Sequence, residues 1–125
     1  MDPISVIIRV RNEERWLGHS IQSVLDHFEY PELIVIDNMS TDKSITIANL
    51  FSHDTSLPFN DKRYTDVKKI KICDYTPGKA INLGVNNASR KFILIISSHC
   101  VIKSLNKQKL FDELNDYGAI FGKQI

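Results

Sequence analysis

The sequence has few of the features that mark several large protein classes. Only two cysteines occur among 125 residues, and Cys73 and Cys100 are not in a CxxC spacing, which weighs against a zinc knuckle or a disulfide framework. We therefore expect two free, buried thiols. The longest apolar run, residues 92–96, is far too short to cross a bilayer, and no signal-peptide pattern follows Met1. These absences predict a cytoplasmic protein with no transmembrane segment.

Two well-known motifs are also missing. No GxGxxG follows the first predicted strand, which weighs against a nicotinamide or flavin dehydrogenase, and no GxSxG occurs, which weighs against an α/β-hydrolase. The 16 Lys and Arg residues nearly balance the 15 Asp and Glu residues, so a dedicated nucleic-acid partner is not expected. A chain of this length supports one core, so residues 1–125 are predicted to form a single domain.

Hydrophobic periodicity predicts alternating strands and helices. Nearly continuous β-branched runs are typical of strands that are covered on both faces, whereas apolar residues spaced three and four apart indicate helices. The predicted strands are residues 4–10, 33–36, 67–73, 92–96 and 119–121. Three predicted helices are residues 14–28, 79–88 and 105–117. A further helix is predicted to start at a cap formed by Ser40 or Thr41 and to run to residue 51. The strand at 92–96 is expected to be the most buried, the strand at 67–73 to lie near a sheet edge, and residues 52–66 to form a surface loop.

This order of elements predicts an α/β fold: a doubly wound, mainly parallel, Rossmann-like sheet with helices on both faces. Ligands bind such sheets at the carboxyl ends of the strands. Four segments follow predicted strands, and we expect them to share one cleft: residues 9–13, 37–40, 73–79 and 97–100.

Each of these segments contains candidate binding residues that also have an ordinary structural explanation. Asn12 and Glu13 can bind a ligand or form a polar helix start, and Asp37 can accept a hydrogen bond from a base N–H or serve as a turn residue. Lys79 follows Pro77-Gly78 at a helix start that suits either a phosphate or a simple cap. His99 can ligate a metal, bond a phosphate oxygen or be a structural histidine beside Cys100.

Taken together, four segments resemble the nucleotide-binding half of the family 2 glycosyltransferases, which have the GT-A fold. Residues 5–14 look like the opening strand and turn of that family, and residues 32–42 are similar to its strand-two motif. Residues 78–84 match its Gly-basic-Ala-x-Asn-x-Gly helix, and residues 90–100 fall on the strand that ends in its Asp-x-Asp metal motif.

The resemblance implies an inverting transfer of a sugar from a nucleoside diphosphate donor, usually with Mg²⁺ or Mn²⁺. It implies that Asp37 holds the base and that the nucleotide site contains Val10, Arg11, Asn12, Glu13, Asp37, Asn38, Lys79, Asn82 and Ser97. Ser97 and His99 stand at the two aspartate positions, which leaves His99 as the candidate metal ligand. Losing two carboxylates is expected to weaken the binding of a divalent metal. Val10 and Asn38 are smaller departures from the family pattern.

The resemblance assigns no catalytic residue in this sequence. The acidic base of the family lies beyond the metal motif, where the later carboxylates Asp112, Glu113 and Asp116 fall on a predicted helix. This chain alone is therefore expected to be slow or inactive. The alternative is a non-catalytic module that binds a nucleotide or a partner chain, including a second copy that covers an exposed sheet edge. A flavodoxin-like regulator explains the fewest of these segments.

Overall fold

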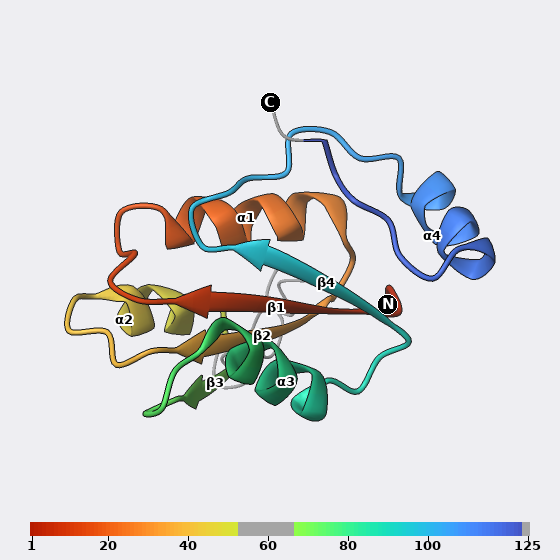
Figure 1. The fold of residues 1–125 in the computed structure, drawn as a ribbon. Coiled ribbons are helices and arrows are strands. Elements are labelled where there is room, and N and C mark those ends of the chain that lie inside the picture. The colour runs from red at the N-terminus through yellow and green to blue at the C-terminus, as the bar shows by residue number, and fades with distance from the viewer. Residues whose placement is uncertain (53–66, 124–125) are drawn as a thin grey trace.

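The computed structural model describes residues 1–52 and 67–123, and it confirms the predicted alternation of strands and helices (Figure 1). The four strands are all parallel and lie in the order β3-β2-β1-β4. Their bounds are β1 (Ile4–Val10), β2 (Glu32–Asp37), β3 (Val67–Lys71) and β4 (Phe92–Ser97). The helices are α1 (Leu17–His27), α2 (Ser44–Asn49), α3 (Pro77–Asn87) and α4 (Lys107–Asp116). Apart from Ser52, the predicted loop at 52–66 lies outside the described residues.

Two apolar clusters form on opposite faces of the sheet, as a doubly wound fold requires. Successive side chains of a strand point to opposite faces, so β1 contributes to both clusters. Ile4, Val6, Ile8 and Val10 pack with buried residues of α1 and α2, whereas Ile7 packs with Ala80 of α3. Every residue of β2 is buried as well. The centre of the sheet is therefore covered on both faces.

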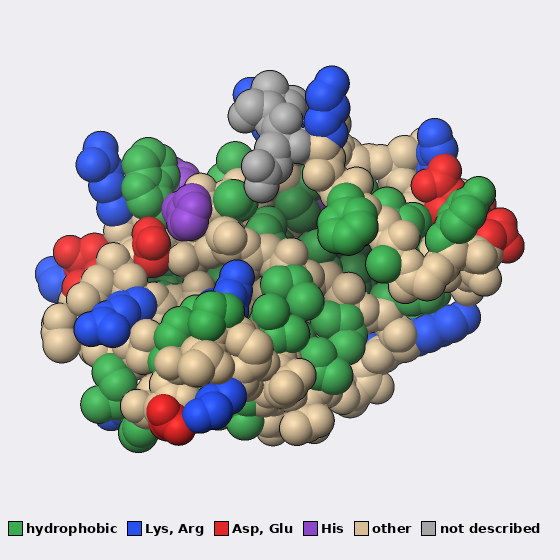
Figure 2. Space-filling model, viewed as in Figure 1, with side chains coloured by type: hydrophobic (Ala, Val, Ile, Leu, Met, Phe, Trp, Pro, Cys, Tyr) green, Lys and Arg blue, Asp and Glu red, His purple; other side chains and the backbone are tan. Residues whose placement is uncertain are grey.

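The prediction that β4 is the most buried strand is wrong. β4 pairs with β1 alone and lies at the edge of the sheet, although its run of five apolar residues is typical of a central strand. Phe92, Leu94 and Ile96 pack on the α1 side, but Ile93 and Ile95 face the other side and are 40% and 46% exposed. Figure 2 shows hydrophobic side chains on this face, where Figure 1 places β4 and α3.

Three further expectations need correction. Helix α1 begins at Leu17 and not at residue 14, because Trp16 and Leu17 first form a turn by donating to the carbonyl oxygen of Glu13. No strand forms at residues 119–121, where Phe121 is 93% exposed. Cys73 is an exposed free thiol and Cys100 is half-buried. No helix among the described residues is long and apolar enough to cross a membrane.

A buried carboxylate fastens the amino end of the sheet. Glu32 of β2 is 8% exposed and accepts hydrogen bonds from Ser5 Oγ of β1 (2.6 Å) and Lys68 Nζ of β3 (2.9 Å). It also accepts from the backbone N–H (2.8 Å) and the hydroxyl (2.7 Å) of Ser89, which precedes β4. Burial by itself raises the pKa of Glu32, but these four hydrogen bonds outweigh it and lower the pKa to about 2.

Replacement of Glu32 by Gln is expected to lower the free energy of unfolding at neutral pH by about 2 kcal/mol, because an amide cannot accept all four hydrogen bonds. The folded-state pKa of about 2 lies below the unfolded value of 4.5, so this stabilisation is complete above pH 4.5 and disappears as the pH falls toward 2. Urea unfolding of the wild type and E32Q across that range measures the difference. The exposed Glu29→Gln is the control, and a pH-independent difference would contradict the assignment.

Helix α3 packs closely on β1 through a glycine. A Cβ atom added at Gly84 would lie 2.7 Å from Cγ2 and 2.9 Å from Cδ1 of the fully buried Ile7, whereas a Cβ at Gly78 would meet nothing within 4 Å. Gly84→Ala is therefore expected to lower the free energy of unfolding by about 1–3 kcal/mol despite the better helix propensity of Ala. Gly78→Ala is expected to be neutral or stabilising. Equal losses in the two variants, measured by urea unfolding, would refute this account.

Candidate functional site

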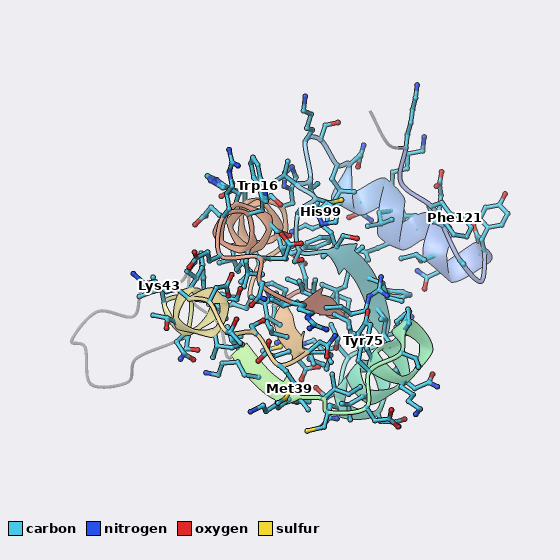
Figure 3. All side chains as sticks on the ribbon, turned by 60° about the vertical axis from the view of Figure 1, so that its left-hand side comes forward. Trp16, Met39, Lys43, Tyr75, His99 and Phe121 are labelled. Atoms are coloured by element: carbon cyan, nitrogen blue, oxygen red, sulfur yellow. The ribbon has the colours of Figure 1, made fainter. Side chains whose placement is uncertain are left out.

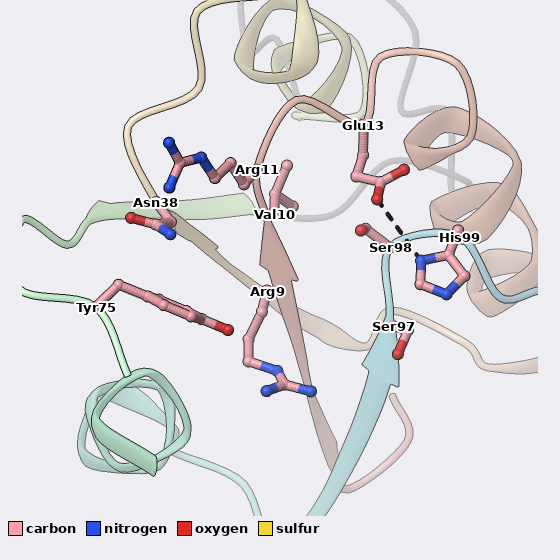
Figure 4. A pocket seen from close by; sticks show the side chains of 9 residues that line it. All are labelled: Arg9, Val10, Arg11, Glu13, Asn38, Tyr75, Ser97, Ser98 and His99. Carbon is pink, nitrogen blue, oxygen red and sulfur yellow. Dashed lines mark ion pairs between the residues drawn. The ribbon is translucent and has the colours of Figure 1, made fainter. Parts of the chain in front are cut away.

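A cavity of about 420 Å³ opens at the carboxyl ends of β1 and β4 (Figure 4). It is lined by Arg9, Val10, Arg11, Glu13, Asn38, Tyr75, Ser97, Ser98 and His99. In Figure 3, where the carboxyl ends face the viewer, Tyr75 lies on the α3 side of the sheet and His99 on the α1 side. Each of the four segments that were predicted to share one cleft contributes at least one side chain, so that prediction is confirmed.

The cavity contains some of the predicted site residues and not others. It brings together Val10, Arg11, Glu13, Asn38, Ser97 and His99. The other predicted residues, which do not line it, are Asn12, Asp37, Lys79 and Asn82. Three lining residues were not predicted as site residues: Arg9, Tyr75 and Ser98. A charged residue inside an otherwise apolar strand was the signal for Arg9, whereas Tyr75 has no distinguishing signal in the sequence.

Asn12 joins the loop after β1 to the loop after β2. Its backbone has a φ of 50°, in the left-handed region that Asn tolerates better than most residues. Its side-chain oxygen accepts from the backbone N–H groups of Thr41 (2.7 Å) and Asp42 (3.3 Å), and its own N–H donates to Ser40 Oγ (3.0 Å). Ser40 therefore binds the neighbouring loop and does not cap α2. Asn12 positions the rim of the cavity from outside it.

Asp42 and Glu14 extend this connection between the two loops. Asp42 accepts from the backbone N–H of Glu14 (3.0 Å) and from the hydroxyl of Ser44 (2.6 Å), and Glu14 accepts from the N–H of Lys43 (3.0 Å). Burial raises the pKa of the Asp42 carboxyl, but the hydrogen bonds from Ser44, Glu14 and its own backbone outweigh burial and hold the pKa below its usual value. The loop after β1 is thus fixed at several points, which also fixes Glu13 at the cavity.

Asp37 ends β2 and is 7% exposed. Its Oδ1 accepts from the N–H of Ser40 (3.1 Å), while its Oδ2 has no hydrogen-bond partner among the described residues. The next residue, Asn38, donates its backbone N–H to the carbonyl oxygen of Val10 (2.8 Å) and lines the cavity with its side chain. One oxygen of Asp37 is therefore available to a ligand that donates an N–H or O–H.

The start of α3 is a capped helix. Thr76 Oγ1 accepts from the N–H of Lys79 (3.1 Å), and Pro77 occupies the first turn. The Lys79 ammonium pairs with Asp74 (2.5 Å), and both side chains are exposed. Asn82 is exposed on the next turn. Among the alternatives for this segment, the structure shows the cap, and the only cavity-lining side chain that it places nearby is Tyr75.

His99 lies next to Glu13 on one side of the cavity, with its Nδ1 3.6 Å from Oε1 of Glu13 (Figure 4). The hydroxyls of Ser97 and Ser98 lie on the same side, so this side of the cavity offers one carboxylate, one imidazole and two hydroxyls. Within residues 1–52 and 67–123, no group of three or more His, Cys, Asp and Glu side chains is arranged to hold a metal ion. Hard divalent cations such as Mg²⁺ require several oxygen ligands, and these residues do not fit one.

Comparison with known proteins relates this chain to sugar-transferring enzymes. The sequence model described as glycosyl transferase family 2 matches residues 5–124. The minor teichoic acid biosynthesis protein GgaA of Bacillus subtilis is 34% identical over 114 residues, which cover 86% of this chain and 24% of GgaA. An uncharacterised glycosyltransferase of Haemophilus influenzae is 33% identical over 120 residues, covering 92% of this chain and 42% of that protein. This chain thus spans less than half the length of these relatives.

Two crystal structures of S. aureus TarS share the fold. The TarS 1-349 structure superposes with a TM-score of 0.68 and 24% sequence identity, covering 91% of this chain and 32% of that one. The second TarS structure gives a TM-score of 0.72 and 21% identity, covering 92% of this chain and 20% of that one. The α/β fold described above is therefore one that a larger protein contains as a part.

Replacement of Asn12 by Ala is expected to lower the free energy of unfolding by about 2 kcal/mol, because it removes the side-chain hydrogen bonds of Asn12 to Thr41 and Asp42 and strains the positive φ. Asn12→Gly loses the same side-chain bonds without the strain, so its loss should be smaller than that of Asn12→Ala. Asn86→Ala, at an exposed position of α3, is the control and should change stability little. Urea unfolding ranks the three variants, and Asn12→Ala unfolding like the control would show that the loops hold together without Asn12.

Proposed function

The chain belongs to glycosyltransferase family 2, and from this premise we propose that it binds a nucleoside diphosphate sugar for transfer of the sugar to an acceptor. The observation that supports this proposal most directly is the cavity at the carboxyl ends of the parallel strands, which is where nucleotides bind in doubly wound sheets. The transfer itself is proposed for the whole protein of which such a chain forms the donor-binding part.

In this proposal Asp37 recognises the base. Its unpartnered Oδ2 accepts an N–H from the base, and its other oxygen keeps the Ser40 turn in place. Val10, Arg11, Glu13, Asn38 and Ser97 line the cavity that receives the rest of the nucleotide. Asn12 acts by holding the loop that presents Glu13. Lys79 and Asn82 do not line the cavity, and their place beside the nucleotide stays a prediction.

Transfer with inversion requires a base that deprotonates the acceptor hydroxyl. Asp112, Glu113 and Asp116 belong to α4, which lies at the opposite end of the molecule from the carboxyl ends of β1 and β2 (Figure 1). We assign none of them to catalysis, and the catalytic base stays unassigned. The predicted role of His99 as a metal ligand and the predicted cytoplasmic location stay predictions.

A second candidate function is supported by the uncovered edge of the sheet. Ile93 and Ile95 are exposed on β4, whose outer edge pairs with no strand among the described residues. Unpaired apolar edges recruit further polypeptide. This chain would then be a module that binds a partner polypeptide, including a second copy of itself, and nucleotide binding would be dispensable.

Calorimetric titration with UDP, GDP, CDP and dTDP tests the donor-binding proposal. We expect saturable binding of at least one nucleotide, and we expect Asp37→Asn to weaken it at least about tenfold, because the amide presents a donor where the base needs an acceptor. The exposed Asp116→Asn on α4 is the control and should bind like the wild type. Binding that D37N leaves unchanged would refute the role of Asp37. A folded chain that binds none of the four nucleotides would refute the donor-binding function and favour the interaction module.

A further inference from the structure

Two arginine side chains line the cavity and have no side-chain partner among residues 1–52 and 67–123. Arg9 projects from β1 on the side of α3, and Arg11 follows in the loop (Figure 4). Neither makes a hydrogen bond or ion pair with any other described residue, and Nε of Arg9 is buried without an acceptor. A buried donor that lacks an acceptor is unfavourable, so an occupant of the cavity that supplies acceptors would be bound there.

The other half-buried cations among the described residues, Arg90 and Lys107, have acceptors, and so does the more exposed Lys68. The guanidinium of Arg90 donates to the carbonyl oxygens of Asp2 and Tyr30, and Lys68 and Lys107 pair with carboxylates at 2.9 Å. The fold therefore satisfies buried and half-buried positive charges in general. Within the described residues, Arg9 is the half-buried cation that has no acceptor. Because Arg9 lines the cavity, a bound ligand can supply that acceptor.

The charge of the cavity is positive. Glu13 is the one carboxylate among the lining residues, and it already faces His99 at 3.6 Å. Arg9 and Arg11 contribute two permanent positive charges, because guanidinium groups stay protonated at any physiological pH. Tyr75 and Ser97 add hydroxyl groups, and in Figure 4 the hydroxyl end of Tyr75 points toward Arg9. This set of groups suits an anion with several oxygen acceptors.

The same cavity is poorly suited to a divalent metal. Ser97 and His99 supply a hydroxyl and an imidazole, and the described residues contain no cluster of three metal-binding side chains. A diphosphate needs its negative charge balanced, whether a metal or side chains provide the positive charge. Guanidinium groups bind phosphate oxygens through two parallel N–H donors, so arginines can balance that charge directly.

We propose that Arg9 and Arg11 hold the diphosphate of the donor directly, so that this chain binds it without a divalent metal. The inference rests on the proposed function for the identity of the donor, but the anion site itself is defined by the arginines. The guanidinium of Arg9 lies between the ends of β1 and β4 (Figure 4). Direct contact with Arg9 would therefore fix where the diphosphate lies in the cavity.

Titration with inorganic pyrophosphate and with the nucleotide panel above, in EDTA and then with added Mn²⁺, tests the inference. The wild type should bind pyrophosphate in EDTA, and Arg9→Met should weaken that binding at least about tenfold. Arg9→Lys keeps the charge but loses the two parallel donors, so its affinity for pyrophosphate should lie between that of the wild type and that of Arg9→Met. Arg15→Met, which removes an exposed cation that stacks over Trp16 and does not line the cavity, should change affinity less than about twofold.

The outcomes separate this inference from the proposed function. Nucleotide binding that requires Mn²⁺ and survives Arg9→Met would overturn the inference and leave the donor-binding function intact. Metal-free, Arg9-dependent binding of pyrophosphate without binding of any nucleotide would support the anion site and overturn the donor-binding function. Circular dichroism and thermal unfolding of each variant distinguish a lost anion contact from a lost fold. Pyrophosphate binding in EDTA that Arg9→Met leaves at the wild-type level, in a folded protein, would overturn the role of Arg9.

Discussion

The burial of β1 between two helical layers is the constraint on which the rest of the structure depends. β1 is the only strand that pairs with both β2 and β4, and the chain reaches those two neighbours by crossovers on opposite faces of the sheet. At the carboxyl edge of the sheet the loops after β1 and β2 lead to helices on one face, whereas the segment after β3 leads to α3 on the other face. These segments leave a space between them at the end of β1. The cavity is a consequence of this topology, and Arg9 and Val10 line it because they end the central strand.

The two ends of the sheet serve different purposes. At the amino end, the Glu32 carboxylate collects four hydrogen bonds from β1, β3 and the segment before β4, so its polar groups are fully used in holding the strands together. At the carboxyl end, Asn12 joins the loops after β1 and β2, but Arg9 and one oxygen of Asp37 have no partners among the described residues. These two groups lie at the end of the sheet where a ligand can satisfy them.

The cavity carries positive charge at the place where the family resemblance implies a metal site. Where the family resemblance implies two carboxylates, this chain has Ser97 and His99, and the change removes negative charge from the same cavity to which Arg9 and Arg11 add positive charge. Both features favour an anion over a cation in this cavity. On the face of β4 that points away from α1, Ile93 and Ile95 are exposed.

The sequence by itself determined the alternation of strands and helices up to α4 and the parallel α/β fold, because buried parallel strands and amphipathic helices leave period signals that need no knowledge of distant contacts. The family followed from the resemblance of four short motifs and not from periodicity. It also determined which strand ends meet, since parallel strands end at one edge. Only the tertiary structure decided that β4 is an edge strand, because a run of apolar residues has the same sequence pattern whether the strand has one neighbouring strand or two. Likewise, whether a polar residue such as Asn12 or Arg9 binds the protein or faces the cavity depends on partners about thirty or more residues away, and no local pattern encodes that distance.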